Sequence, residues 1–552
     1  MSRKVVLIGL DAADLDVLRP LIERGELPHI AQLMRAGASG VLHSTVPPVS
    51  APAWASFLTG CHPGKHGLYS FVVERGQADG IQAESGGPGN TQLATLNDIH
   101  GAKLWDVVAA QGVRPVVANI PVTWPTPAFD GAIVTGMLTP ESRAVQWTHP
   151  PELAAEIDAA VPGYKIDIDR SMMDAKDTLF AGMTAMTEKR RDLFIHLLQT
   201  QDYGLFVGAF TNTDRAQHAF WRKHREHVDQ HFHDVDTHIG RILEVIDREK
   251  TIVMLMSDHG FQSAQWKLYV NRFLEEAGLL ATHRGEDDAY DRRRPDFFDD
   301  FQGGRSEADK RAASKSDGAL GKMLKKVGVG GRTVMDWSRT RAFTWSLDTA
   351  GIGINLKSRY AHGIVEDADY ETVRNEVIAQ LSALELPDGG AAFRTVRRRE
   401  DVYTGPRAHL APDIVTEPSD AMDLGIQLDA KSVFRRHKHP EGHHSPRGFV
   451  SITGPGCKQG VTIEGNIVDC LPTMLHALGL AVPEGLDGRV LVSAFDDDRE
   501  VRTTVAMDTG SDDPGAETGT NTGTGTNTDA GTGFSDEEEE ALRRSLEGLG
   551  YL

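Results

Sequence analysis

The stretch VVLIGLD, residues 5–11, decides the fold of this 552-residue chain. Five of its first six residues are apolar and the seventh is a carboxylate, so the run is too short to span a membrane. An almost continuous apolar run of this length is typical of a strand buried on both faces of a mostly parallel sheet. In such sheets the functional residues gather just beyond the carboxyl ends of the strands, which makes Asp11 a candidate site residue.

Three further apolar runs repeat this pattern and alternate with helix-like stretches. The runs are Val116–Ile120, Leu205–Phe210 and Thr251–Ser257, and helical patterns cover Leu104–Gln111 and Asp234–Arg248. This alternation predicts an α/β fold, a three-layer αβα sandwich with a mostly parallel central sheet. Polar residues follow two of the runs directly, at 211–214 and 258–259.

The composition excludes several classes of protein. Hydrophobic residues make up 40% of the chain, and the formal net charge of -21 disfavours nucleic acid and anionic membrane surfaces as partners. The three cysteines are too widely spaced for a disulfide framework or a thiolate metal site. Because no stretch approaches 18 consecutive apolar residues and the N-terminus lacks a secretory pattern, we expect a cytoplasmic protein without a membrane segment.

Changes in composition predict the domain organisation. Residues 1–280 and 342–500 are expected to form the catalytic domain, and the charged, aperiodic segment 281–341 an inserted cap or mobile loop. The Thr/Gly-rich stretch 508–533 reads as a disordered linker. Residues 535–552 predict a short helix with acidic residues in its first turn, whose leucines would dock on the body or on a neighbouring subunit.

Ser50 is a candidate nucleophile. It stands in PPVSAPAWASFLTG, immediately before a predicted helix with Pro52 near its start and Gly60 past its end. A hydroxyl at a helix N-terminus faces backbone N–H groups and the positive end of the helix dipole, where a phosphoryl group is favoured.

The remaining candidates are carboxylates and imidazoles. Asp214 and His218 are four residues apart and share one face of a helix, Asp258 and His259 end a strand, and His443–His444 precede the last strand. Each has a plainer explanation by itself as a turn, a cap or a solvated face, but together they predict a metal site. Such ligands suit zinc and also accept manganese. Two ions about 4 Å apart would activate the serine and hold the phosphoryl oxygens.

With these motifs, the sequence resembles the alkaline phosphatase superfamily, in the branch of the type I phosphodiesterases and nucleotide pyrophosphatases. It looks most like the group described as predicted phosphohydrolases or phosphomutases. The resemblance runs from Val5 to about Leu491, and 281–341 matches poorly. It is carried by LIGLDAAD (7–14), PPVSAPAWASFLTGCHPGKHG (47–67), PVTWP (121–125), TDRAQHAFW (213–221), SDHGF (257–261), NRFLEEAGLL (271–280) and IVDCLPTMLHALGL (467–480).

The resemblance implies an alkaline-phosphatase-like fold, two divalent metal ions and a phosphoryl-serine intermediate. The implied ligands of one ion are Asp11, Ser50, Asp258 and His259. Those of the other are Asp214, His218 and His444, because related chains place a glycine four residues after the last histidine and Gly448 fits only His444. His66 also recurs in the superfamily, and we expect it to position its loop rather than bind metal.

Departures from the family pattern leave the substrate open. Phosphodiesterase relatives use an asparagine, and alkaline phosphatase an arginine, to grip the phosphate, and neither residue follows Ser50 in the matching stretch. Lys65 or Arg292–Arg294 could serve instead, so monoester and diester substrates both stay possible. A sulfatase is disfavoured because Trp54 replaces the arginine of the formylglycine motif.

The predicted function is metal-dependent hydrolysis of a small phosphorylated substrate, such as a phosphodiester or a nucleotide- or sugar-linked phosphate. A phosphomutase of the same superfamily is the nearest alternative. Independent-type phosphoglycerate mutases carry a large inserted domain after the nucleophile, whereas only 164 residues separate Ser50 from Asp214 here. The other alternative is a non-catalytic binding protein that retains the fold, which the full set of ligands disfavours.

Overall fold

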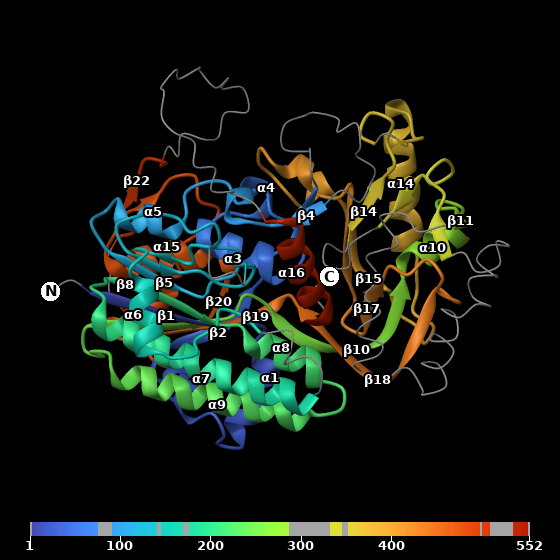
Figure 1. Cartoon of the computed structure of the whole chain (residues 1–552). Helices are drawn as coiled ribbons and strands as arrows, with labels where there is room; N and C mark the ends of the chain where they lie inside the picture. Colours follow the sequence, from blue (N-terminus) through green and yellow to red (C-terminus); the bar gives the residue numbers. More distant parts are fainter. Residues whose placement is uncertain are drawn as a thin grey trace.

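The computed structural model is built around a nine-stranded sheet (Figure 1). It describes residues 3–74, 91–140, 145–168, 176–285, 332–344, 351–360, 362–496, 500–507 and 534–549. The strand order is β20-β2-β19-β9-β1-β8-β5-β6-β7. The strands are β20 (Val461–Asn466), β2 (Ala38–His43), β19 (Arg447–Thr453), β9 (Thr251–Met256), β1 (Lys4–Leu10), β8 (Leu205–Phe210), β5 (Pro115–Ala118), β6 (Ala132–Val134) and β7 (Thr148–His149).

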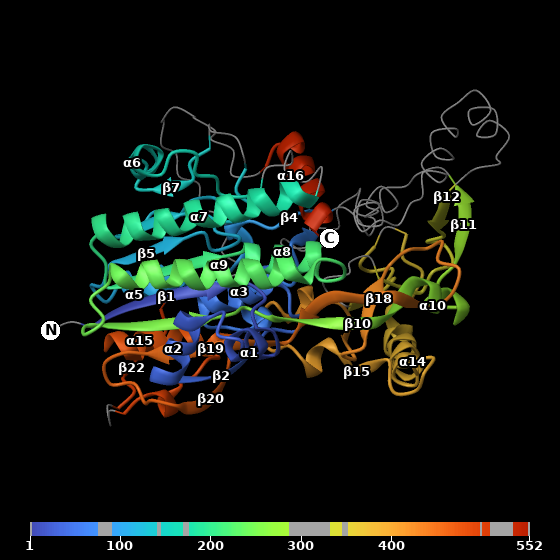
Figure 2. The ribbon, with the colours of Figure 1, turned by 90° about the horizontal axis from the view of Figure 1, so that it is seen from below.

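The sheet is mostly parallel, as the sequence predicts. Within it β19 and β7 run antiparallel to their neighbours, whereas the other neighbouring pairs are parallel. Every residue of β8 and β9 is buried, because helices cover both faces. One face carries α7 (Lys176–Thr200), α8 (Asn212–Phe220) and α9 (Arg225–Glu244), and the other carries α3 (Ser50–Thr59), α5 (Leu104–Ala109) and α15 (Cys470–Leu478) (Figure 2). The predicted three-layer αβα architecture is confirmed.

A second hydrophobic core lies beside the main sheet, in residues between Leu268 and Leu428. We call the described residues within 266–434 the smaller lobe. The lobe contains α10 (Val270–Glu276), α14 (Tyr370–Ser382) and the sheet β13-β14-β16-β15, formed by Ala342–Phe343, Gly351–Ile354, Ile414–Pro418 and Phe393–Arg398. A three-stranded sheet, β17-β10-β18, joins it to the main body, with β17 at Met422–Gly425, β10 at Gly260–Tyr269 and β18 at Phe434–Ser445.

Most of the predicted insertion at 281–341 and all of the predicted linker at 508–533 lie outside the described residues. At the ends of the insertion, β11 (Thr282–Gly285) pairs antiparallel with β12 (Arg332–Met335). Beyond the linker, α16 (Asp536–Leu549) packs near α8 and β4 (Thr91–Leu93) and buries Leu542 and Leu546 in the main core. Here the C-terminal helix docks on its own chain.

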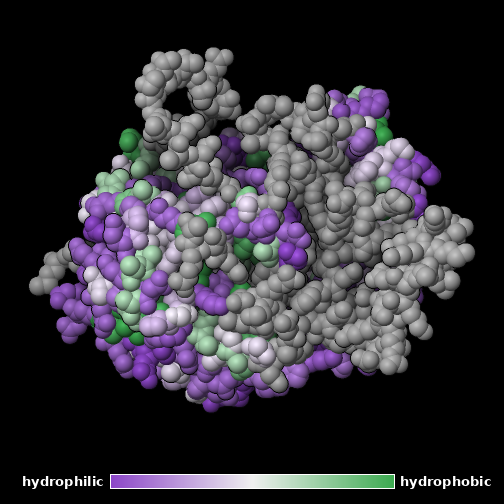
Figure 3. Space-filling model, in the orientation of Figure 1, coloured by the Kyte–Doolittle hydropathy of each residue, from purple (hydrophilic) through white to green (hydrophobic). Residues whose placement is uncertain are grey.

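The described surface is mainly hydrophilic on the side shown in Figure 3, with hydrophobic residues scattered over it. Among the described helices, none combines the length and the apolar character that a bilayer-spanning segment requires.

A close contact between β1 and α3 brings the residues that follow β1 near the helix that begins at Ser50. Trp54 of α3 is fully buried, and its indole packs over Gly9 of β1. A Cβ atom at Gly9 would lie only 2.4 Å from the Cη2 atom of Trp54. The absent side chain therefore lets α3 approach the strand that ends at Asp11.

This contact predicts the effect of Gly9→Ala. The added methyl group overpacks the Trp54 contact and should lower the free energy of unfolding by about 1–3 kcal/mol. Urea denaturation measures this change. The double variant Gly9→Ala/Trp54→Phe, which lacks the clashing ring atom, should recover part of the loss. Equal stability of Gly9→Ala and the natural protein would show that this approach is not tight.

Candidate active site and metal centre

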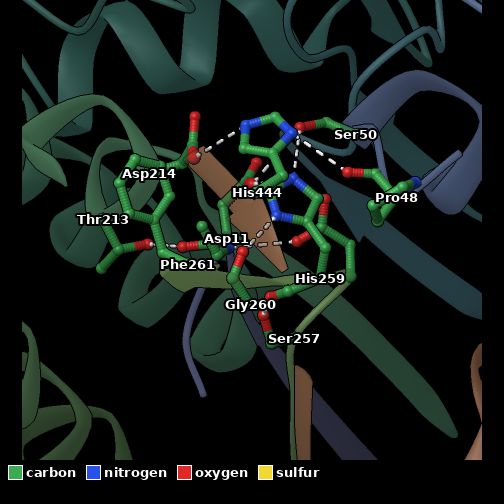
Figure 4. Close-up of polar contacts among 12 residues, drawn as sticks. Asp11, Pro48, Ser50, Thr213, Asp214, Ser257, His259, Gly260, Phe261 and His444 are labelled. Atoms are coloured by element: carbon green, nitrogen blue, oxygen red, sulfur yellow. Dashed lines mark hydrogen bonds and ion pairs between the residues drawn. The ribbon is translucent and has the colours of Figure 1, made fainter. Parts of the chain in front are cut away.

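The seven predicted site residues converge at the carboxyl end of the central sheet. Figure 4 shows Asp11, Ser50, Asp214, His259 and His444 among them. Strands β8, β1 and β9 are neighbours in the sheet, so the residues that follow them meet at one edge. Asp11 follows β1, Asp214 and His218 lie on α8 after β8, and Asp258 and His259 follow β9; Ser50 is the first residue of α3, and His444 lies near the end of β18.

The first group of side chains surrounds the Ser50 hydroxyl. Ser50 Oγ lies 3.4 Å from Asp11 Oδ1 and 3.1 Å from His259 Nε2. His259 Nε2 is also 3.6 Å from Asp11 Oδ1 and 3.3 Å from Asp258 Oδ2. Asp11, Asp258 and His259 each offer one ligand atom, and these atoms lie within 4.8 Å of one another. All four side chains are fully buried.

The second group contains Asp214, His218 and His444. Asp214 Oδ1 lies 3.5 Å from His218 Nε2 and 3.4 Å from His444 Nε2. The two imidazole nitrogens are 2.8 Å apart. The groups adjoin each other because the ring of His259 stacks on that of His444, with centroids 3.9 Å apart.

The structure separates the two candidate histidines of β18. Adjacent side chains on a strand point to opposite faces, so only one can enter the site. His444 lies among the second group, whereas His443 Nε2 contacts the backbone carbonyl of Asp420 at 3.4 Å.

Hydrogen bonds to backbone carbonyls fix the tautomers of two histidines. His259 Nδ1 lies 3.1 Å from the carbonyl of Gly260, and His444 Nδ1 lies 3.0 Å from that of Pro48. Since a carbonyl accepts only from N–H, each Nδ1 carries a hydrogen, and in the neutral imidazole Nε2 then presents its lone pair. Metal-binding histidines in proteins are oriented in the same way.

These lone pairs face other lone pairs, which is unfavourable unless a cation or a proton lies between them. His259 Nε2 points at carboxylate oxygens of Asp11 and Asp258. Asp11 Oδ2 and Asp258 Oδ2 are buried and have no hydrogen-bond partner among the described residues. Carboxylate oxygens and imidazole nitrogens in this arrangement fit two divalent cations of the zinc or manganese type.

Burial shapes the protonation of the site. It raises the pKa of Asp258 to about 7, and burial together with repulsion from Asp258 raises that of Asp11 well above its usual range. Burial opposes ionisation of Asp214 too, but His218 and His444 hold its pKa below the usual value. Burial lowers the pKa of His218 to about 4, so this imidazole is neutral and able to act as a ligand.

Several positioning contacts escape the sequence patterns. The backbone N–H of Ala12, which has a φ of 57°, donates to Asp258 Oδ1 at 3.2 Å. Thr213 Oγ donates to the Asp11 carbonyl at 2.6 Å. Phe261 packs edge-on against His218, with ring centroids 4.9 Å apart. Thr213 precedes Asp214 and Phe261 lies two residues after His259, and this closeness in the sequence is the one local signal that could have identified them.

Among the described residues, Lys65 and His66 lie outside the two groups of site residues. Lys65 Nζ pairs with Asp487 at 2.5 Å and donates to the carbonyl of Gly485 at 2.8 Å. Arg292–Arg294 lie outside the described residues. His66 Nε2 contacts Ser56 Oγ at 2.8 Å and thereby links α4 (Pro63–His66) to α3, which fits the positioning role expected of it.

Comparisons with known proteins show the family and the fold of this chain. A family model described as type I phosphodiesterase / nucleotide pyrophosphatase matches residues 5–449. The chain is similar in fold to phosphonoacetate hydrolase from Sinorhizobium meliloti 1021, solved with phosphonoformate, at 13% identity and a TM-score of 0.54; the match covers 87% of this chain and 96% of that one. It is also similar to human ectonucleotide pyrophosphatase / phosphodiesterase 5, at 12% identity and a TM-score of 0.50, over 90% of this chain and all (100%) of that one. A search of curated proteins found no match.

The raised pKa of Asp258 predicts how pH acts on the metal-free protein. An exposed aspartate titrates near about 3.9, so the folded protein holds an extra proton up to about pH 7. The stabilisation from that proton is lost as the pH rises through 7. Asn mimics the protonated carboxyl, so natural metal-free protein should lose about 2–3 kcal/mol relative to Asp258→Asn between pH 5 and 8.

Thermal or urea unfolding after chelation measures this difference. The exposed Asp202→Asn is the control for the loss of one negative charge. Zinc should reverse the order, because it stabilises the natural protein more than Asp258→Asn. A pH-independent difference between the two proteins would contradict the buried, proton-sharing arrangement.

Proposed function

The chain belongs to the type I phosphodiesterase / nucleotide pyrophosphatase family, and we propose that it hydrolyses phosphoric esters at two divalent metal ions through a phosphoryl-serine intermediate. Membership confirms the predicted superfamily and makes the protein a phosphohydrolase. The observation that carries the covalent mechanism is the position of Ser50, whose hydroxyl lies between Asp11 and His259 at the first residue of α3.

The start of α3 supports phosphoryl binding beside Ser50. The helix has ten residues, and Val49, at its N-cap, offers no side-chain hydrogen bond to the first N–H groups. Uncapped N–H groups and the helix dipole favour an anion at this end. A phosphoryl group attached to Ser50 would lie against them. This gives the phosphate a donor other than the asparagine or arginine of the relatives.

Two ligand sets would hold the ions. Asp11, Ser50, Asp258 and His259 would hold one, and Asp214, His218 and His444 the other. When bound, ions of this kind stabilise a serine alkoxide and the negative charge on phosphoryl oxygens. We favour zinc because each set includes at least one imidazole, and manganese is the alternative.

The chain's own groups then set the geometry of the reaction. The carbonyls of Gly260 and Pro48 keep the rings of His259 and His444 in the ligand orientation. Ser50 Oγ gives up its proton and forms a bond to phosphorus, while the bond from phosphorus to the ester oxygen breaks and that oxygen leaves with the electron pair and takes up a proton. Water then attacks phosphorus, the bond to Ser50 Oγ breaks, and a proton of the water goes to Ser50 as phosphate or a phosphomonoester is released.

Hydrolysis is favoured over phosphoryl transfer within one substrate. Described elements between Ser50 and Asp214, such as β5, β6 and β8, belong to the main sheet, and the helices α5 and α7 cover it. A mutase needs a substrate held for two successive transfers, and its family relatives use an extra domain at this point in the chain. The full set of seven ligand residues also disfavours a binding protein without activity.

Ser50→Ala should lower hydrolysis by about a thousandfold or more, because it removes the nucleophile. The assay compares p-nitrophenyl phosphate with bis-p-nitrophenyl phosphate after chelation and after zinc or manganese is restored. The better substrate decides between monoester and diester. Ser445→Ala is the matched control, since this buried serine lies beside His444 but outside both ligand sets.

Full metal-dependent activity of Ser50→Ala would exclude the covalent mechanism. Two bound metals without turnover of either substrate would favour a mutase or a narrow natural substrate. Failure to bind metal at all would favour the non-catalytic alternative.

A further inference from the structure

The segment that leads into Ser50 is held partly through its carbonyl groups, in addition to the hydrogen bond that Ser44 N donates to Pro446 O at 2.8 Å. It connects β2 to α3 and reads STVPPVS at 44–50. Pro47 and Pro48 have no N–H, so neither can donate to a strand or turn. The position of this segment therefore depends on which groups reach its carbonyl oxygens.

Three consecutive carbonyls of the segment accept hydrogen bonds, two from distant parts of the chain and the middle one from within the segment. Pro48 O accepts from His444 Nδ1 at 3.0 Å, a contact visible in Figure 4. Pro47 O accepts from Thr45 Oγ at 2.6 Å. Val46 O accepts from Tyr403 Oη at 2.6 Å, across 357 positions of the sequence.

Tyr403 belongs to the smaller lobe. It lies in the connection between β15 and β16, is 4% exposed, and meets the ring of Tyr69 edge-on at 4.9 Å. Val415 of β16 joins the same small cluster, and the side chain of Val46 packs against it. Burial raises the pKa of the Tyr403 hydroxyl well above its usual range, so the group stays a hydrogen-bond donor.

The connection that carries Tyr403 is fixed on the main body by its backbone. Arg407 N donates to Gly64 O at 2.9 Å, and a Cβ at Gly64 would lie 2.2 Å from the carbonyl oxygen of Thr404. Gly64 belongs to α4, which the His66–Ser56 contact links to α3. Contacts therefore link α3 to α4, α4 to the connection that carries Tyr403, and Tyr403 to the segment before Ser50.

We propose that Tyr403 is a positioning residue, which holds Val46 and thereby sets the Ser50 hydroxyl relative to the metal ligands. His444 and Tyr403 hold the segment at two carbonyls, those of Pro48 and Val46. The smaller lobe then contributes directly to the reactivity of the nucleophile. This inference rests on the proposed function for its kinetic consequence but not for the contact itself.

Tyr403→Phe tests the inference because it removes the hydroxyl and keeps the ring. Misplacement of the nucleophile acts on the chemical step, so kcat should fall about tenfold with KM within about twofold. Metal content should stay at the level of the natural protein. Hydrogen exchange of peptides covering residues 44–54 should become faster, since Val46 O has lost its partner.

Tyr69→Phe is the matched control. It removes a neighbouring buried hydroxyl of the same cluster, one that donates to Arg407 O at 3.1 Å and does not touch the segment before Ser50. Its kcat and its exchange at 44–54 should stay within about twofold of the natural protein. Equal kcat and equal exchange in the two variants would overturn the inference, and so would a rise in KM without a fall in kcat.

The kinetic and exchange measurements also separate this inference from the proposed function. If the natural protein hydrolyses neither p-nitrophenyl substrate, the proposed function fails and the exchange comparison alone decides whether Tyr403 holds the segment. If the natural protein is active and Tyr403→Phe keeps its full rate, only the present inference fails.

Discussion

Three carboxylates, Asp11, Asp214 and Asp258, are buried together at the carboxyl end of the central sheet, and the local structure is arranged around this concentration of negative charge. Carboxylates in an apolar interior are strongly unfavourable unless they are protonated, hydrogen-bonded or balanced by cations. Hydrogen bonds stabilise only part of this negative charge; the N–H of Ala12, for example, donates to a single oxygen of Asp258. The imidazoles add lone pairs rather than positive charge, because burial keeps His218 and His259 neutral. Divalent cations would balance the charge of the carboxylates and would accept the lone pairs of the imidazoles. We therefore expect metal binding and the stability of this region to be linked.

The three buried carboxylates also constrain the elements that surround them. A buried charge cluster needs rigid support, and the parallel strands β8, β1 and β9 supply it from the centre of the sheet. Ser50 has to approach from another element, which requires α3 to lie close to β1. The small size of Gly9 permits that approach, and the buried Trp54 fills the remaining space. The packing of Trp54 against Gly9 therefore also helps to set the position of Ser50 relative to Asp11.

The sequence patterns reveal the part of this arrangement that is local. Strands β1, β8 and β9 are apolar runs that end next to polar residues, so both the sheet and the position of Asp11, Asp214 and Asp258 at its carboxyl end could be predicted. The choice of His444 over His443 depended on family resemblance, because strand alternation does not say which face meets the site. The extent of the smaller lobe could not be predicted, since its strands are short and β10 pairs with β17 and β18, more than 150 residues away. The contact of Tyr403 could not be predicted for the same reason, because its partner carbonyl lies 357 positions away in the sequence.

The strands that connect the main body to the smaller lobe also carry residues of the site. Strand β10 begins at Gly260, immediately after His259, and β18 ends at Ser445, immediately after His444. The two strands pair antiparallel, with Phe261 opposite His444, and they continue into the core of the smaller lobe. One ladder therefore carries ligands of both proposed metal sites at one end and supports the smaller lobe at the other. Because a hydrogen-bonded ladder resists shear, a shift of the lobe would move His259 and His444 unless the ladder yields at its irregularity between Ala264 and Trp266. Sequence changes in the loops of the smaller lobe would then leave the positions of these two histidines undisturbed.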